Sequence, residues 1–250
     1  MPKAGRYREG VPCWVALAVP DVERARRFYR GLFGWDFVPT GPAEAVATLH
    51  GAQVAAVGPP SEPPAWLTCL ATPDVRRSAA AVRAAGGRLL REPYDVPDQG
   101  RAALAADPQG ARFGLWQGGP VPGAGLVNEP GTLTWNEHLS PDPDAARAFY
   151  RQVFGLTHDH PRDGYTVFRA QGLPAGGIGP SPSDDARAAW LTSFATDDAD
   201  RAADRVRALG GTVLSGPEPT PFGRSSLVRD DGGAVFTLVA VPPDESAEAA

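Results

Sequence analysis

Glu137 is the side chain that we expect to carry a proton. It follows Trp135 by two residues in an apolar, alternating stretch that predicts a strand, so both side chains share one face. In a partly apolar pocket a carboxylate binds its proton more tightly, which suits a general acid or base. The alternative is a surface or rim carboxylate near a neighbouring arginine.

Three tryptophans could form a flat apolar surface for a ligand. Trp14 and Trp135 take the cavity-facing position of their predicted strands, and Trp116 lies on the same side of its strand as Gly114. Indole rings offer a large contact area with defined geometry, so they could stack on a planar or apolar ligand. Packing in the core is the alternative role.

Small and basic residues complete the predicted ligand-binding set. Cys69 and Ser193 face the same cavities by strand parity, and neither has a nearby histidine in sequence that would mark a nucleophile pair. We therefore interpret both as pocket-lining residues. Arg101 and Arg224 each follow a glycine at a strand start, where they could anchor an acidic or carbonyl-bearing ligand or serve structure alone.

The composition narrows the class of protein. The 250 residues carry a formal charge of −5, with 42% hydrophobic and 21% charged residues, so no basic excess favours nucleic acid. No apolar run reaches the roughly 18 residues of a membrane span, and the first residues lack the apolar core of a secretory signal. Cys13 and Cys69 form no disulfide framework or metal-type spacing. We expect a cytoplasmic protein whose partner is a small molecule, with no nucleic acid and no membrane.

The elements that position these residues come in copies. The stretch "RRFYRGLFGW" from Arg26 returns as "RAFYRQVFGL" from Arg147, and "AWLT" from Ala65 returns from Ala189. Trp14 recurs as Trp135 at an offset of 121 positions. The chain is thus a tandem duplication, joined by the glycine- and proline-rich segment 117–131, which predicts a linker.

Each half contains a weaker repeat, which predicts four modules. Each module consists of a strand, an aspartate that caps a helix, the helix, a terminal glycine and three further strands. The helices are expected to end at Gly34, Gly86, Gly155 and Gly210. We predict domains over 11–116 and 132–241, with flexible ends at 1–10 and 242–250. Two paired modules would form a curved sheet whose concave face holds a ligand.

These motifs resemble a known superfamily. The stretches "PDVERARRFYRGLFGW", "FYRQVFG", "RAAGG", "RALGG" and "DPQGARFGLW" are similar to the vicinal oxygen chelate proteins. That superfamily includes glyoxalase I, extradiol dioxygenases, fosfomycin-resistance enzymes and bleomycin-binding resistance proteins. The resemblance spans residues 11–241 and implies an α+β fold of four βαβββ modules in two domains, packed as an internal pseudo-dimer in a monomer or homodimer. Tandem members of GC-rich bacteria include several near natural-product pathways.

The resemblance also implies positions for metal ligands, and here they hold other residues. Superfamily enzymes usually bind a divalent metal with histidine, glutamate or glutamine from the first and last strands of a module. The corresponding residues are Trp14, Leu67, Trp135, Leu191, Gly114 and Thr237. Indole and aliphatic groups cannot ligate such a cation. We therefore predict no metal and no cofactor, and we assign Thr237 to the ligand-binding set.

The predicted function follows from these residues. We expect a metal-independent protein that binds a small apolar or aromatic metabolite and tailors it by acid–base chemistry at Glu137. The first alternative is a binding protein that sequesters a toxic compound. The second is a glyoxalase-like lyase or dioxygenase with unusual metal ligands.

Overall fold

The computed structural model describes residues 7–41, 44–58, 64–183 and 186–240. The predicted flexible segment 242–250 and residues 1–6 lie outside these ranges. The first half of the chain contains β1 (Pro12–Ala18), α1 (Val22–Phe33), β2 (Asp36–Gly41), β3 (Glu44–Leu49), β4 (Ala52–Gly58), β5 (Ala65–Ala71), α2 (Val75–Ala84), β6 (Arg88–Val96), β7 (Gly100–Ala106) and β8 (Arg112–Gly118). The second half contains β9 (Leu133–Ser140), α3 (Pro143–Phe154), β10 (Thr157–His158), β11 (Thr166–Ala170), β12 (Leu173–Pro180), β13 (Ala189–Thr196), α4 (Ala199–Ala208), β14 (Thr212–Thr220), β15 (Gly223–Arg229) and β16 (Val235–Ala240).

This element order confirms the four predicted βαβββ modules and the α+β class. The N-cap of α1 is Asp21, whose side chain accepts the backbone N–H of Arg24. Asp142 caps α3 in the same way, ahead of a proline in the first helical turn. The α1 and α3 helices end at Gly34 and Gly155, both in the left-handed conformation. The C-caps of α2 and α4 are Ala85 and Leu209, each one residue before the predicted glycine, so the local signals located these helix ends to within one residue.

Each half of the chain supplies one eight-stranded sheet. The strand orders are β2-β3-β4-β1-β5-β8-β7-β6 and β10-β11-β12-β9-β13-β16-β15-β14. Within a module the first and last strands are parallel, as in the pairing of β9 with β12, and the last three strands pair antiparallel. The first strand of each module therefore lies beside its last, which brings residues far apart in sequence together.

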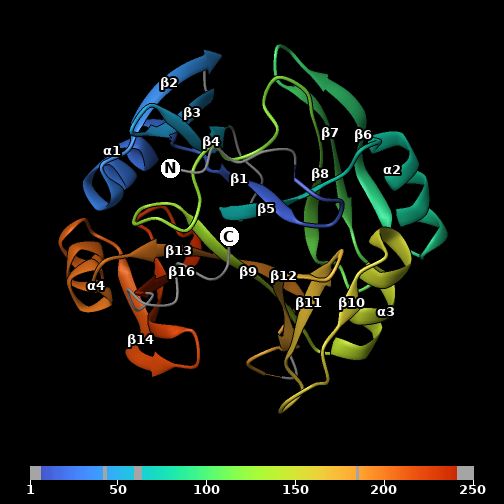
Figure 1. Ribbon diagram of the computed structural model, residues 1–250. Coiled ribbons are helices and arrows are strands. Elements are labelled where there is room, and N and C mark those ends of the chain that lie inside the picture. Colours follow the sequence, from blue (N-terminus) through green and yellow to red (C-terminus); the bar gives the residue numbers. More distant parts are fainter. Residues whose placement is uncertain (1–6, 42–43, 59–63, 184–185, 241–250) are drawn as a thin grey trace. The chain divides into compact units, whose positions relative to one another are not determined.

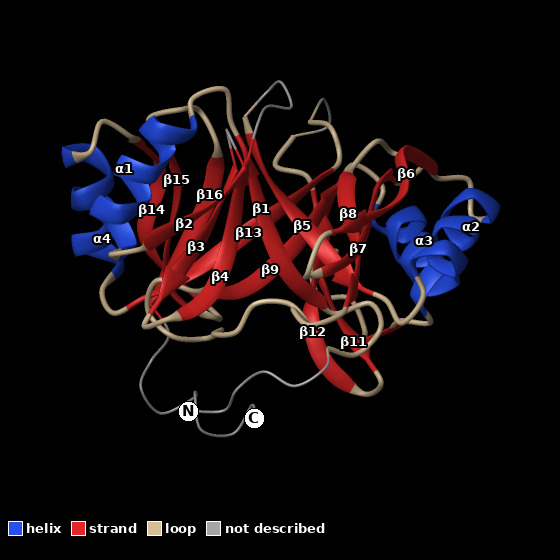
Figure 2. Cartoon of the chain, turned by 90° about the horizontal axis from the view of Figure 1, so that it is seen from above, coloured by secondary structure: helices blue, strands red, loops and turns tan. Residues whose placement is uncertain are grey.

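The compact units of the chain combine modules from different halves. Unit 1 comprises Met1–Trp14, Leu67–Gly123 and Trp135–Leu191, and unit 2 comprises Val15–Trp66, Ala124–Thr134 and Thr192–Ala250. The helices of unit 1, α2 and α3, lie side by side, as do α1 and α4 of unit 2 (Figures 1 and 2). Each unit thus has its own helix pair and its own hydrophobic core.

Helical spacing explains how these cores form. In α1 the buried residues Ala25, Phe28 and Tyr29 share one face, and Ala146, Phe149 and Tyr150 do the same in α3. The α1 residues join the core of unit 2 and the α3 residues join that of unit 1.

Within the described ranges, no helix has the length and apolar character that a membrane span needs.

Candidate functional site

In unit 1, Glu137 lies at the end of a hydrogen-bonded chain of three side chains, formed by Trp135, Tyr165 and Glu137 itself. The hydroxyl of Tyr165 donates to Glu137 Oε1 at 2.8 Å. The indole N–H of Trp135 donates to the oxygen of Tyr165 at 3.1 Å. Trp135 and Glu137 are alternate residues of β9, so they extend from the same face of the strand as predicted. The sequence interpretation thus gave two of the three members.

Tyr165 is delivered by a tight turn before β11. Asp163 and Gly164 occupy the centre of the turn with φ of 50° and 79°, and Arg162 and Tyr165 exchange backbone hydrogen bonds of 2.9 Å. An Asp-Gly pair with positive φ at both positions is typical of the type I′ hairpin turn. Local sequence therefore sets where the tyrosine emerges.

Arg147 attaches this turn to α3. Its guanidinium donates to the carbonyl oxygen of Gly164 at 3.2 Å and to Thr166 Oγ1 at 3.0 Å. It also forms an ion pair with Asp144 at 2.8 Å, while its own side chain is mostly buried. A rigid guanidinium fork suits such a link between a helix and a loop. The turn that carries Tyr165 is thereby fixed to the body of unit 1.

Burial gives Glu137 an altered acidity. Loss of solvent raises the pKa of the Glu137 carboxyl, while the hydrogen bonds from Tyr165 and Trp135 act in the lowering direction. Burial also raises the pKa of Tyr165, as does the charge of Glu137, so the tyrosine stays protonated and acts as a donor. This arrangement can hold and exchange a proton, which is the chemistry of a general acid or base.

Three other predicted residues of unit 1, Trp14, Cys69 and Trp116, lie on β1, β5 and β8. Cys69 on β5 pairs with Gly114 on β8 and accepts, through its backbone carbonyl, the thiol of Cys13 at 3.4 Å. Burial raises the pKa of the Cys69 thiol to about 12, so it stays neutral and unsuited to nucleophilic attack. Trp14 and Trp116 are each only 6% exposed, and Trp116 donates its indole N–H to the carbonyl of Val121. Their roles in ligand binding stay predictions.

The predicted ligand-binding residues of unit 2 are Ser193, Thr237 and Arg224. Ser193 on β13 pairs in register with Thr237 on β16, which repeats the Cys69–Gly114 relation. Arg224 is exposed and forms an ion pair with Asp200 in the first turn of α4. In unit 1, Arg101 is also exposed and pairs with Asp95 on the adjacent strand. These ion pairs favour the structural role for both arginines, while ligand anchoring stays a prediction.

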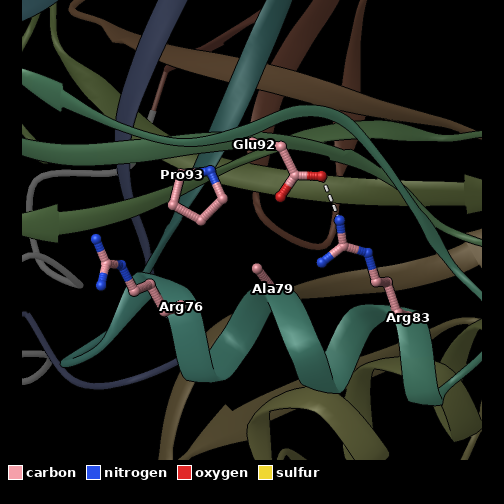
Figure 3. A pocket seen from close by; sticks show the side chains of 5 residues that line it. All are labelled: Arg76, Ala79, Arg83, Glu92 and Pro93. Carbon is pink, nitrogen blue, oxygen red and sulfur yellow. Dashed lines mark hydrogen bonds and ion pairs between the residues drawn. The ribbon is translucent and has the colours of Figure 1, made fainter.

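A shallow depression of about 330 Å³ lies between α2 and β6. Figure 3 shows its lining residues, with Arg83 and Glu92 joined in an ion pair across it. Arg76, Ala79 and Pro93 complete the lining. Two arginines and a glutamate line this depression, and Glu137 is not among its lining residues. We therefore place the candidate chemistry at the Trp135–Tyr165–Glu137 chain.

Sequence reasoning missed Tyr165, although a signal for it exists. Tyr165 lies 28 residues after Glu137, and its counterpart 121 positions earlier is Glu44. Glu137 itself corresponds to Ala16. The second half therefore has a carboxylate and a tyrosine hydroxyl in hydrogen-bonding contact, where the first half has an alanine and a glutamate. A position-by-position comparison of the two copies would have drawn attention to the tyrosine.

With this fold and site, the chain belongs to the Glyoxalase/Bleomycin resistance protein/Dioxygenase superfamily, whose family model matches residues 13–115 and 137–238. The predicted membership is therefore confirmed. The chain is 39% identical to the candidate glyoxylase CFP32 of Mycobacterium tuberculosis, over 98% of this chain and all of the relative. It is 34% identical to the anthracycline biosynthesis protein DauV of Streptomyces sp. (strain C5), over 94% of each chain. Among solved structures, the Mn(II)-bound glyoxalase from Novosphingobium aromaticivorans has a TM-score of 0.68 and 21% identity, covering 94% of this chain and 85% of that one.

The residues at the family's metal positions do not fit a divalent cation. Trp14, Leu67, Trp135 and Leu191 stand at the first-strand positions, and none of these side chains offers a carboxylate oxygen or imidazole nitrogen. Glu137 lies nearby on β9, but its Oε1 already accepts a hydrogen bond from Tyr165. Among the residues that the structure describes, no group of three or more histidine, cysteine, aspartate or glutamate side chains could hold a metal ion.

Proposed function

We propose that this protein binds a small, largely apolar or aromatic metabolite and tailors it by metal-independent acid–base chemistry, with Glu137 as the proton carrier. The observation that carries this proposal is the hydrogen bond of 2.8 Å from the Tyr165 hydroxyl to the half-buried Glu137 carboxylate. A carboxyl with a raised pKa releases and takes up its proton closer to neutral pH, where such catalysis is efficient.

The relatives support the ligand class. DauV of Streptomyces sp. (strain C5) and DnrV of Streptomyces peucetius, which is 33% identical over 94% of each chain, are both anthracycline biosynthesis proteins. Anthracyclines are planar and aromatic, which suits a surface lined by indole rings. We therefore take anthracycline-type aromatic polyketides as the first compounds to test.

A single-turnover experiment tests the proposal. The purified protein is mixed in excess with an anthracycline aglycone, and the compound is followed by absorbance and mass spectrometry. We expect Glu137→Gln to keep the binding while the rate falls by roughly 10²–10⁴-fold. Glu44→Gln is the matched control, because it removes a carboxylate from the Tyr165 position of the other half. A wild-type rate in Glu137→Gln would remove this residue from the mechanism.

The same experiment separates the alternatives. If the wild-type protein binds the aglycone tightly and returns it unchanged, sequestration replaces catalysis as the function. Under sequestration Glu137→Gln would change the affinity by no more than a lost hydrogen bond, on the order of 1 kcal/mol. Turnover that disappears on dialysis against a chelator and returns with one added divalent metal would favour the lyase or dioxygenase alternative.

A further inference from the structure

Three positions around the candidate site differ together between the two halves of the chain. Glu137, Tyr165 and Gly177 correspond, at the same offset of 121 positions, to Ala16, Glu44 and Ala56. The backbone register is nevertheless the same, because Gly177 pairs with Glu137 as Ala56 pairs with Ala16. The two copies thus share the same strand pairing and differ in the side chains at these three positions.

Gly177 is the position that makes room for the tyrosine. A Cβ atom at Gly177 would lie 2.0 Å from the hydroxyl oxygen of Tyr165. A Cβ atom at Gly179 would lie 2.7 Å from Tyr165 Cδ2. The ring therefore lies directly against β12, and the alanine found at position 56 of the first half would displace it. Tyrosine and glycine form a matched pair that occurs in the second half.

Trp135 fixes the direction of the hydrogen-bonded chain. An indole N–H can only donate, so the oxygen of Tyr165 must act as its acceptor. The single hydroxyl proton of Tyr165 is then directed to Glu137 Oε1. A carboxylate that accepts such a bond is stabilised in its charged form.

We propose that Tyr165 is a positioning residue that sets the protonation and orientation of Glu137, and that, among the described residues, this arrangement belongs to the second half of the chain. Its assignment to catalysis rests on the proposed function. Among the described residues of unit 1, the polar groups that act on the Glu137 carboxyl are Tyr165 and Trp135, and both act through hydrogen bonds. Burial is already the largest influence on the Glu137 pKa, and loss of the tyrosine hydroxyl removes one of the two hydrogen bonds that oppose it.

The first test measures the acidity of Glu137 directly. The protein is prepared with ¹³C-carboxyl glutamate, and the Glu137 signal is assigned by its loss in Glu137→Gln. In Tyr165→Phe we expect the pKa of Glu137 to rise by about one to two units, because a hydrogen bond to the charged form has been removed. An unchanged or lowered pKa would overturn the proposal.

Three further variants test whether the effect on the Glu137 pKa comes from the Tyr165 hydroxyl. Gly177→Ala leaves the phenol intact but displaces it, so the pKa of Glu137 should rise as in Tyr165→Phe. Gly58→Ala, at the counterpart of Gly179, is the control in the first half, because the added methyl group meets Glu44 at an ordinary 3.7 Å and should leave the pKa of Glu137 unchanged. Replacement of Tyr165 by 3-fluorotyrosine, a more acidic phenol and stronger donor, should lower the pKa instead. The same rise in Gly58→Ala would contradict a direct effect.

Activity then separates this inference from the proposed function. If Glu137 acts as the base, the acidic limb of the pH–rate profile should move to higher pH in Tyr165→Phe, with about a tenfold lower rate per pKa unit below that limb. If Glu137 acts as the acid, the alkaline limb should move to higher pH instead. If Glu137→Gln retains turnover while Tyr165→Phe raises the Glu137 pKa, the proposed function fails and the positioning role stands. If Glu137→Gln loses turnover while Tyr165→Phe changes neither pKa nor profile, the positioning role fails alone.

Discussion

The hydroxyl of Tyr29 donates a hydrogen bond of 2.8 Å to the carboxylate of Asp230, which lies 201 positions later in the chain. The indole N–H of Trp66 in turn donates to the Tyr29 oxygen at 3.0 Å. Unit 1 repeats the arrangement with Tyr150 and Asp107, at 3.3 Å. In each unit the tyrosine and aspartate come from opposite halves of the chain. The duplicated modules are therefore joined across the copies by buried polar contacts.

We expect Tyr29→Phe to destabilise the protein by about 1–3 kcal/mol, because it removes the donor to Oδ2 of a buried carboxylate, while Oδ1 keeps its backbone N–H donors. Tyr150→Phe should cost less, since Asp107 keeps a contact of 2.7 Å with Nε2 of the buried His138. Urea unfolding of both variants measures the difference. An equal loss of unfolding free energy in the two variants would contradict the expected difference between Asp230 and Asp107.

Glu137 should make stability depend on pH. Its folded-state pKa is raised above the ordinary value of 4.5, so the folded protein binds the proton more tightly than the unfolded chain. The free energy of unfolding therefore falls as pH rises from the ordinary pKa through the raised one. Glu137→Gln should melt above wild type near pH 7, with the difference shrinking toward pH 4. Thermal melts across this range provide the measurement, and a gain independent of pH would contradict the linkage.

Ligand binding should change tryptophan emission. If Trp14, Trp116 and Trp135 border the ligand, an anthracycline aglycone should quench or shift their fluorescence on titration. Trp14→Ala and Trp135→Ala, once shown to fold by circular dichroism, should each weaken the binding if their rings stack on the ligand. Unchanged affinity in both variants would leave the rings as core residues.

Chelation should leave the protein active. Because the family's metal positions hold tryptophan and leucine at the first strands, dialysis against EDTA should change neither aglycone binding nor turnover. Elemental analysis of the purified protein provides a second measurement. One zinc, iron, nickel or manganese per chain, removed together with the activity, would contradict metal independence.

The sequence predicted the fold well because its signals are local. Asp142 and Gly155 bracket α3 as expected, since capping depends on side chains within one helical turn. The repeat itself indicated four modules, and the family match confirmed the fold class. Each compact unit draws one module from each half of the chain, and this pairing depends on tertiary contacts that the spacing of the repeats does not carry.

The candidate site was only partly predictable. Alternation along β9 was enough to bring Glu137 and Trp135 to one face. The strand starts of Arg101 and Arg224 suggested a cavity rim, yet the structure gives each an exposed ion pair with an aspartate. Long side chains can reach several partners, so strand parity alone does not decide where a guanidinium lies.

By itself the sequence determined the duplication, the helix boundaries and the shared face of Glu137 and Trp135, because these follow from spacing along a single element. Only the tertiary structure brought Tyr165 to Glu137. That contact depends on a tight turn, on the antiparallel register of β11 with β12 and on the space that Gly177 leaves open. Close packing between strands, rather than any local periodicity, decides which side chain meets the carboxylate.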